Sequence, residues 1–141
     1  MKKILIQLFI VPAIILGIDS CSDKGGGGGG GGGGTTEVNL AVTLNPPAGS
    51  TQPAAPQTDF PLTVTITSTM PPQGVTIDVK VAPDGSTTNF FTDSKSTTSA
   101  ITPFTITGTP AGVVCVTTVT VTSKTKPTNI VTLSYRYTRK P

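Results

Sequence analysis

Histidine and tryptophan are absent from the sequence, and only 12% of its 141 residues are charged. Without histidine, Ser-His-Asp and Cys-His catalytic arrangements are excluded, and the commonest metal ligand is missing. The acidic residues after residue 36 are isolated from one another and lack the spacing of a calcium-binding loop. They are Glu37, Asp59, Asp78, Asp84 and Asp93. We therefore predict that the protein is not an enzyme and has neither a metal site nor a cofactor.

No acidic residue follows Asp93, whereas basic residues continue to the end of the chain. Arg136, Arg139 and Lys140 could contact an anionic surface, such as lipid headgroups or an acidic polysaccharide. Scattered basic residues are more commonly an ordinary solvated surface. We therefore expect no nucleic-acid partner.

The N-terminal residues have the layout of an export signal. Lys2 and Lys3 precede an apolar segment, residues 4–18. That segment is shorter than the ~20 residues of a membrane-spanning helix, and Gln7 and Pro12 interrupt it. These features favour a cleaved signal peptide over a permanent membrane span.

The end of the apolar segment, Ile18-Asp19-Ser20-Cys21, resembles the lipobox of bacterial lipoproteins, although Asp19 stands where that motif usually has a small or apolar residue. The resemblance implies that residues 1–20 are a signal peptide and that a lipid on Cys21 anchors the protein in a membrane of the cell envelope. Ser22 resembles the residue after the cysteine in lipoproteins sent to an outer membrane, which is the expected location.

A glycine run follows the cysteine, because residues 25–34 are all glycine. Such a segment cannot bury apolar surface, so residues 21–36 are predicted to be a disordered tether. A lipidated Cys21 on this tether is a poor disulfide partner for Cys115, the only other cysteine. We therefore predict that Cys115 is an unpaired, buried, apolar side chain.

The remaining hundred or so residues predict a single all-β domain. Threonine, valine and isoleucine are frequent, proline recurs too often for long helices, and apolar residues alternate with polar ones. We expect seven strands, at residues 37–44, 62–66, 75–81, 87–92, 101–107, 113–123 and 129–138. The apolar side chains that alternation places on the core side include Val38, Val75, Ile77, Val79, Val81, Tyr135 and Tyr137.

Three of these expectations concern the second half of the domain. The polar residues 94–99 are predicted to be a loop. Residues 101–107 are predicted to form a two-sided edge strand, with Phe104 and Ile106 on opposite faces. Residues 113–123 are predicted to be a central strand that is buried on both sides in its first half, with Val113 and Cys115 facing inward.

The number and spacing of the strands resemble an immunoglobulin-like or fibronectin III-like domain, and residues 111–116 resemble the opening of the sixth strand of such domains. The resemblance implies a single antiparallel β-sandwich over residues 37–141. The tryptophan and the second cysteine of true immunoglobulin domains are missing. This fold hosts adhesion, carbohydrate-binding and spacing roles alike, so it does not select a function.

Two features are candidates for ligand contact. Residues 45–61 form a long loop with five prolines and little charge. Phe90 and Phe91 are adjacent, so on a strand one ring can enter the core while the other is left outside or at an edge, where it could bind a sugar or a partner. Packing of the second ring under a loop is the more common arrangement. We expect an anchored, non-catalytic protein for adhesion, protein interaction or scaffolding. The alternatives are a carbohydrate-binding module and a small envelope hydrolase or inhibitor.

Overall fold

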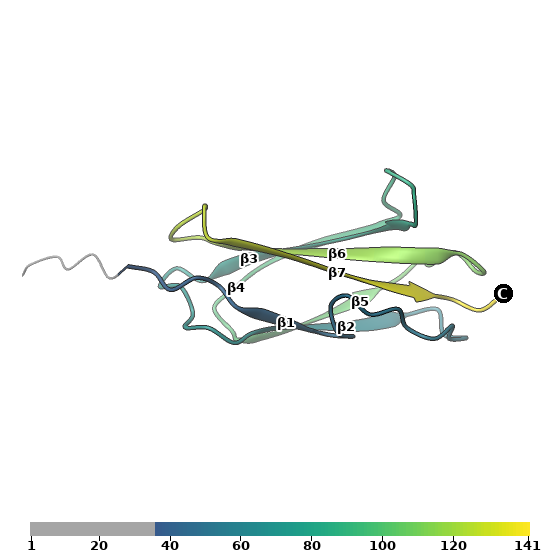
Figure 1. Cartoon of the computed structure of the whole chain (residues 1–141), viewed down its shortest axis with the longest axis horizontal. Helices are drawn as coiled ribbons and strands as arrows, with labels where there is room; N and C mark the ends of the chain where they lie inside the picture. The colour runs from purple at the N-terminus through teal and green to yellow at the C-terminus, as the bar shows by residue number, and fades with distance from the viewer. Residues whose placement is uncertain (1–35) are drawn as a thin grey trace, which may run out of the picture. The chain divides into compact units, whose positions relative to one another are not determined.

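The structure is a computed structural model that describes residues 36–141. The predicted signal peptide, the lipobox with Cys21 and the glycine run lie outside the described residues. The described part forms seven strands and no helix (Figure 1). The strands are β1 (Val42–Asn45), β2 (Phe60–Ile66), β3 (Val75–Pro83), β4 (Phe91–Thr97), β5 (Ile101–Ile106), β6 (Val114–Ser123) and β7 (Ile130–Thr138).

The strands form two antiparallel sheets, one with the order β1-β2-β5 and the other with the order β4-β3-β6-β7 (Figure 1). This arrangement confirms the predicted single, immunoglobulin-like antiparallel β-sandwich. β4 pairs with β3, whereas in immunoglobulin constant domains the fourth strand belongs to the other sheet.

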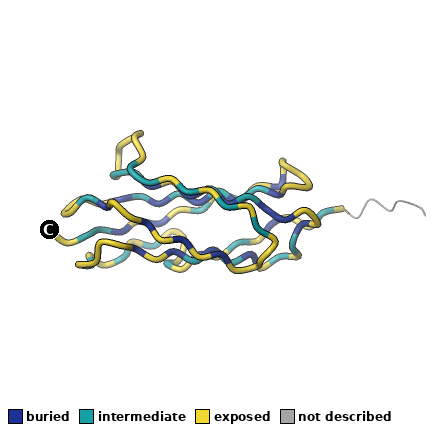
Figure 2. Tube along the Cα trace, turned by 180° about the vertical axis from the view of Figure 1, so that it is seen from behind, coloured by how far each residue is buried: buried dark blue, intermediate teal, exposed yellow. Residues whose placement is uncertain are grey.

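The core lies between the two sheets and takes alternate residues from the strands, while the turns at both ends are exposed (Figure 2). The predicted inward face of β3 is confirmed, because Val75, Ile77, Val79 and Val81 are fully buried. On β7, Tyr135 and Tyr137 are buried, whereas Val131 and Leu133 pack against the core with partial exposure. β-branched and aromatic side chains fit this pleated, half-buried surface well.

The first strand is shorter than predicted, because residues 37–41 are extended but not part of a strand. The buried side chain of Asn129 makes the hydrogen bonds to this segment that a neighbouring strand would otherwise make. Its Oδ1 accepts a hydrogen bond from the backbone N–H of Leu40 (2.9 Å), and its Nδ2 donates to the carbonyl of Val38 (3.0 Å). Val38 lies outside the strand and its side chain is 56% exposed, although alternation placed it in the core.

The prediction of a loop over residues 94–99 is wrong, because most of this segment belongs to β4. β4 is an edge strand with polar residues on both faces, so it has no hydropathy alternation. The Lys95 Nζ lies 4.4 Å from the centre of the Phe104 ring and donates a hydrogen bond to the carbonyl of Pro103 (2.7 Å). The aliphatic part of the lysine thus fills an inward edge position that an apolar residue would otherwise occupy.

The predicted two-sided edge strand at residues 101–107 is only partly correct. β5 is indeed an edge strand, and Pro103 pairs with Thr63 of β2 where proline is tolerated. Phe104 and Ile106 are both buried, however, because residues two apart on a strand share a face.

The position of β6 confirms the prediction of a central strand, because β6 lies between β3 and β7. Cys115 is fully buried, also as predicted. The expectation of burial on both sides is wrong, since Val113 precedes the strand and is 37% exposed and Val114 is 41% exposed on the outer face.

Candidate functional site

The long loop between β1 and β2, here called the proline loop (residues 46–59), is held against the free edge of β7. The N–H groups of Gly49, Gln52 and Ala55 donate to carbonyls of β7 at 2.7–3.0 Å. In return, the carbonyls of Ser50 and Ala55 accept from N–H groups at residues 136 and 140. The loop runs parallel to β7 at two of these points. It therefore closes the sheet edge and has a defined position despite its composition.

A groove of about 360 Å³ lies between the proline loop, the start of β2 and β7. Its floor contains the rings of Phe60, Tyr135 and Tyr137, and its walls are mostly proline and alanine. The full lining is Pro46, Gln52, Pro53, Ala54, Ala55, Pro56, Gln57, Phe60, Pro61, Tyr135 and Tyr137. Of the residues that the structure describes, no charged side chain lines the groove, and two glutamine amides are the polar side chains of its wall. An ionised ligand group would lose its hydration here without compensation.

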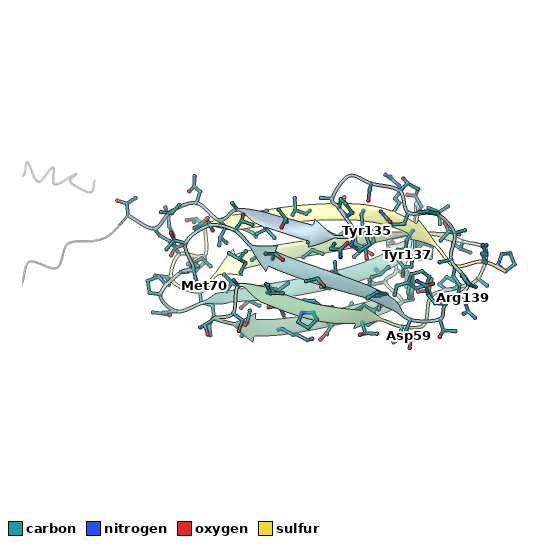
Figure 3. The ribbon with its side chains drawn as sticks, turned by 90° about the horizontal axis from the view of Figure 1, so that it is seen from below. Asp59, Met70, Tyr135, Tyr137 and Arg139 are labelled. Carbon is teal, nitrogen blue, oxygen red and sulfur yellow. The ribbon has the colours of Figure 1, made fainter. Side chains whose placement is uncertain are left out.

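The rings of the floor are packed against one another. The ring centres of Phe60 and Tyr137 are 4.4 Å apart, and those of Tyr135 and Tyr137 are 6.0 Å apart. The two tyrosines come from one strand, at the end of the sandwich that also holds Asp59 and Arg139 (Figure 3). Phe60 is 7% exposed and each tyrosine is exposed by 2% or less, so the rings give the groove a rigid base but little accessible face.

The two tyrosine hydroxyls differ in their hydrogen bonding. The Tyr137 hydroxyl lies 2.9 Å from the hydroxyl of Thr109, which is also buried. Among residues 36–141, neither the Tyr135 hydroxyl nor that of its cross-strand neighbour Thr117 has a hydrogen-bond partner. Burial raises the pKa of both tyrosines above the ordinary value, and the Thr117 hydroxyl, although close, offsets only part of this rise for Tyr135.

Phe90 and Phe91 lie away from the groove, beside β3 and at the opposite edge of the four-stranded sheet from β7. The Phe90 N–H donates to the carbonyl of Val81 (2.9 Å), and Phe91 is paired with the same residue. Two residues therefore oppose one, as at a β-bulge. Both rings are half-buried against the core, so neither ring is fully exposed. Phe90 and Phe91 therefore do not line the groove under the proline loop.

The three basic residues named from the sequence have different surroundings. Arg136 is on the outer face of the sheet, with its Nε 3.3 Å from the Asp84 carboxylate. The Arg139 guanidinium donates to the carbonyl of Thr109 (3.1 Å). The Lys140 side chain is exposed and makes no hydrogen bond among the described residues. They do not form a single charged cluster.

The described residues include no group of three or more histidine, cysteine or acidic side chains placed to hold a metal ion. A helix of membrane-spanning length and hydropathy was likewise not found in residues 36–141.

The sequence indicated the proline loop but not the floor beneath it. Alternation predicted that Tyr135 and Tyr137 face inward, yet nothing local shows that the loop returns across the domain to cover them. Phe60 lies two positions before the predicted second strand, within the segment predicted to be a loop.

No protein-family model, curated protein or solved structure matched this chain in the three comparisons made.

Proposed function

We propose that this protein is a lipid-anchored, non-catalytic protein of the cell envelope whose β-sandwich binds a partner protein through the groove under the proline loop. The observation that supports this most is the hydrogen bonding of the loop to β7, which gives an uncharged groove a fixed shape. A preformed site costs less conformational entropy on binding than a flexible loop does.

The chemistry of the groove favours an apolar side chain on an uncharged, extended segment of the partner. Proline and alanine walls offer methylene and methyl contacts, and Gln52 and Gln57 can bond to a peptide backbone at the rim. A sugar would need an accessible ring face and several directional hydrogen bonds. The rings of the floor are almost fully covered, so carbohydrate binding is the weaker use of this groove.

The groove is tested by site-specific photo-crosslinking in the cells that make the protein. A photoreactive amino acid at Gln57, in the groove wall, should give a discrete adduct, whereas one at the exposed Thr88 of the β3–β4 turn should not. Ala54→Arg brings a charge to the exposed groove wall and should abolish the adduct from position 57. Thr88→Arg is the matched control and should leave it unchanged. No adduct, or one that survives Ala54→Arg, would refute the groove as the binding site.

The anchor is tested separately. Cys21→Ser should prevent acylation and move the protein out of the membrane fraction, while the adduct from position 57 depends on the groove alone. If the serine variant stays in the membrane and retains residues 1–20, the N-terminal segment is an uncleaved anchor and the lipoprotein proposal is wrong.

A further inference from the structure

The outer face of the four-stranded sheet carries a regular array of hydroxyl groups. In the register of the strands, three successive rows of four outward residues lie side by side. The rows are Ser96-Thr76-Thr122-Ile130, Ser94-Asp78-Thr120-Thr132 and Thr92-Lys80-Thr118-Ser134. Nine of these twelve residues are serine or threonine, and we call this surface the hydroxyl face.

The β-propensity of threonine explains why it occurs on strands. Two of the twelve residues of the hydroxyl face are charged. Here the charged pair is Asp78 and Lys80, which lie two residues apart on β3, and their charges cancel. The face therefore has no net charge to attract an anion or a cation.

A polar recess of about 240 Å³ lies on this face between β3 and β4. It is lined by Asp78, Val79, Lys80, Thr92, Asp93 and Ser94. The Ser94 hydroxyl donates to Asp78 Oδ1 (2.7 Å), which positions the carboxylate. Among the described residues, Asp78 Oδ2, Lys80 Nζ and the Thr92 hydroxyl form no hydrogen bond or ion pair. The recess thus presents an acceptor, a donor and a group that can be either.

We propose that the hydroxyl face binds a neutral glycan, with one sugar ring in the recess between β3 and β4. Neighbouring hydroxyls of a sugar need an acceptor and a donor side by side, which the Asp78 carboxylate and the Lys80 ammonium provide. Hydrogen bonds to charged groups are the stronger ones, so this pair dominates recognition. The threonine and serine hydroxyls of β6 and β7 extend the contact along a glycan chain.

This site is independent of the groove under the proline loop. The recess is at the β4 edge of the four-stranded sheet and the groove is at its β7 edge. It also differs from a site at Phe90 and Phe91, because those rings pack against the core and do not line the recess.

The test is calorimetric titration of the detergent-solubilised full chain with three neutral glucose hexasaccharides, linked β-1,4, β-1,3 or α-1,4, and with polygalacturonate as the anionic control. At least one neutral hexasaccharide should bind, with an affinity that changes little with added salt, because no net charge is involved. Asp78→Asn and Lys80→Met should each weaken binding at least about tenfold, the equivalent of ~1.4 kcal/mol. Asp59→Asn and Lys124→Met make the same chemical changes at exposed positions outside the hydroxyl face and should have no effect.

Thermal melting of each variant verifies that it is folded. The proposal is wrong if none of the three neutral hexasaccharides binds, or if a hexasaccharide binds equally to the parent and to both hydroxyl-face variants. It is also wrong if only polygalacturonate binds and added salt abolishes the interaction, since that result assigns binding to the basic residues near the C-terminus. Loss of the groove adduct described above would leave this result unaffected.

Discussion

Two tyrosines on one strand should respond in opposite ways to the same substitution. Tyr137→Phe removes the partner of the Thr109 hydroxyl, which is 1% exposed and would be left buried without a hydrogen bond. Such a loss costs about 1–3 kcal/mol. For a domain of this size each kcal/mol lowers Tm by about 4–8 °C. Tyr135→Phe removes a hydroxyl that has no hydrogen-bond partner in the described part of the chain, so it should be neutral or stabilising by up to about 1 kcal/mol.

The measurement is urea unfolding of the parent, the two single variants, Thr109→Val and the double variant Thr109→Val/Tyr137→Phe. The double variant removes both hydroxyls, so it should be more stable than the sum of the two single losses predicts. Equal destabilisation by Tyr135→Phe and Tyr137→Phe would refute the reasoning, because it would mean that the Tyr135 hydroxyl also has a partner.

Two further predictions concern stability. Asn129→Ala leaves the backbone N–H of Leu40 buried without a partner and should lower the free energy of unfolding, measured in urea, by about 1–3 kcal/mol. The control Asn39→Ala, at an exposed position, should change it by less than about 0.5 kcal/mol. Similar effects of the two substitutions would contradict the role of Asn129. Burial raises the pKa of the Cys115 thiol and of both tyrosines, so above the unfolded-state values of about 8.5 and about 10 the unfolded chain loses protons first. The free energy of unfolding should therefore fall with rising pH by up to about 1.4 kcal/mol per pH unit for each group. Cys115→Ala should remove the loss of stability that begins below pH ~10, because that loss comes from the thiol. An unchanged pH profile for this variant would contradict the burial of the thiol.

The strands that could be predicted are those with one face in the core. β2, β3, β6 and β7 alternate apolar and polar residues because their inner faces pack between the sheets, and the sequence shows this directly. β4 could not be predicted in this way, since Lys95 covers the core at the sheet edge with its aliphatic part and Asp93 and Ser94 resemble loop residues.

The candidate sites, too, could be predicted only in part from the sequence. The composition of residues 45–61 indicated a long loop, but the hydrogen bonds that hold it against β7 join residues more than eighty positions apart. The hydroxyl face depends on the register of four strands, and a shift of one residue would turn every side chain of a strand to the other face. Alternation in the sequence indicates the outward residues of β3, β6 and β7, but not those of β4 or the register that places the four strands side by side.

The parallel course of the proline loop and β7 also determines how the domain would bear mechanical load. The described chain begins beside Asn129, at the start of β7, and ends beyond Thr138, so its two ends lie at opposite ends of the sandwich (Figure 1). Tension between them would act along the loop and β7 and would stretch their shared hydrogen bonds together, in shear, instead of opening them one by one. The hydrogen bonds of Asn129 with residues 37–40 lie between the N-terminal point of loading and the loop. The loop bonded to β7 would then hold the rest of the sandwich together.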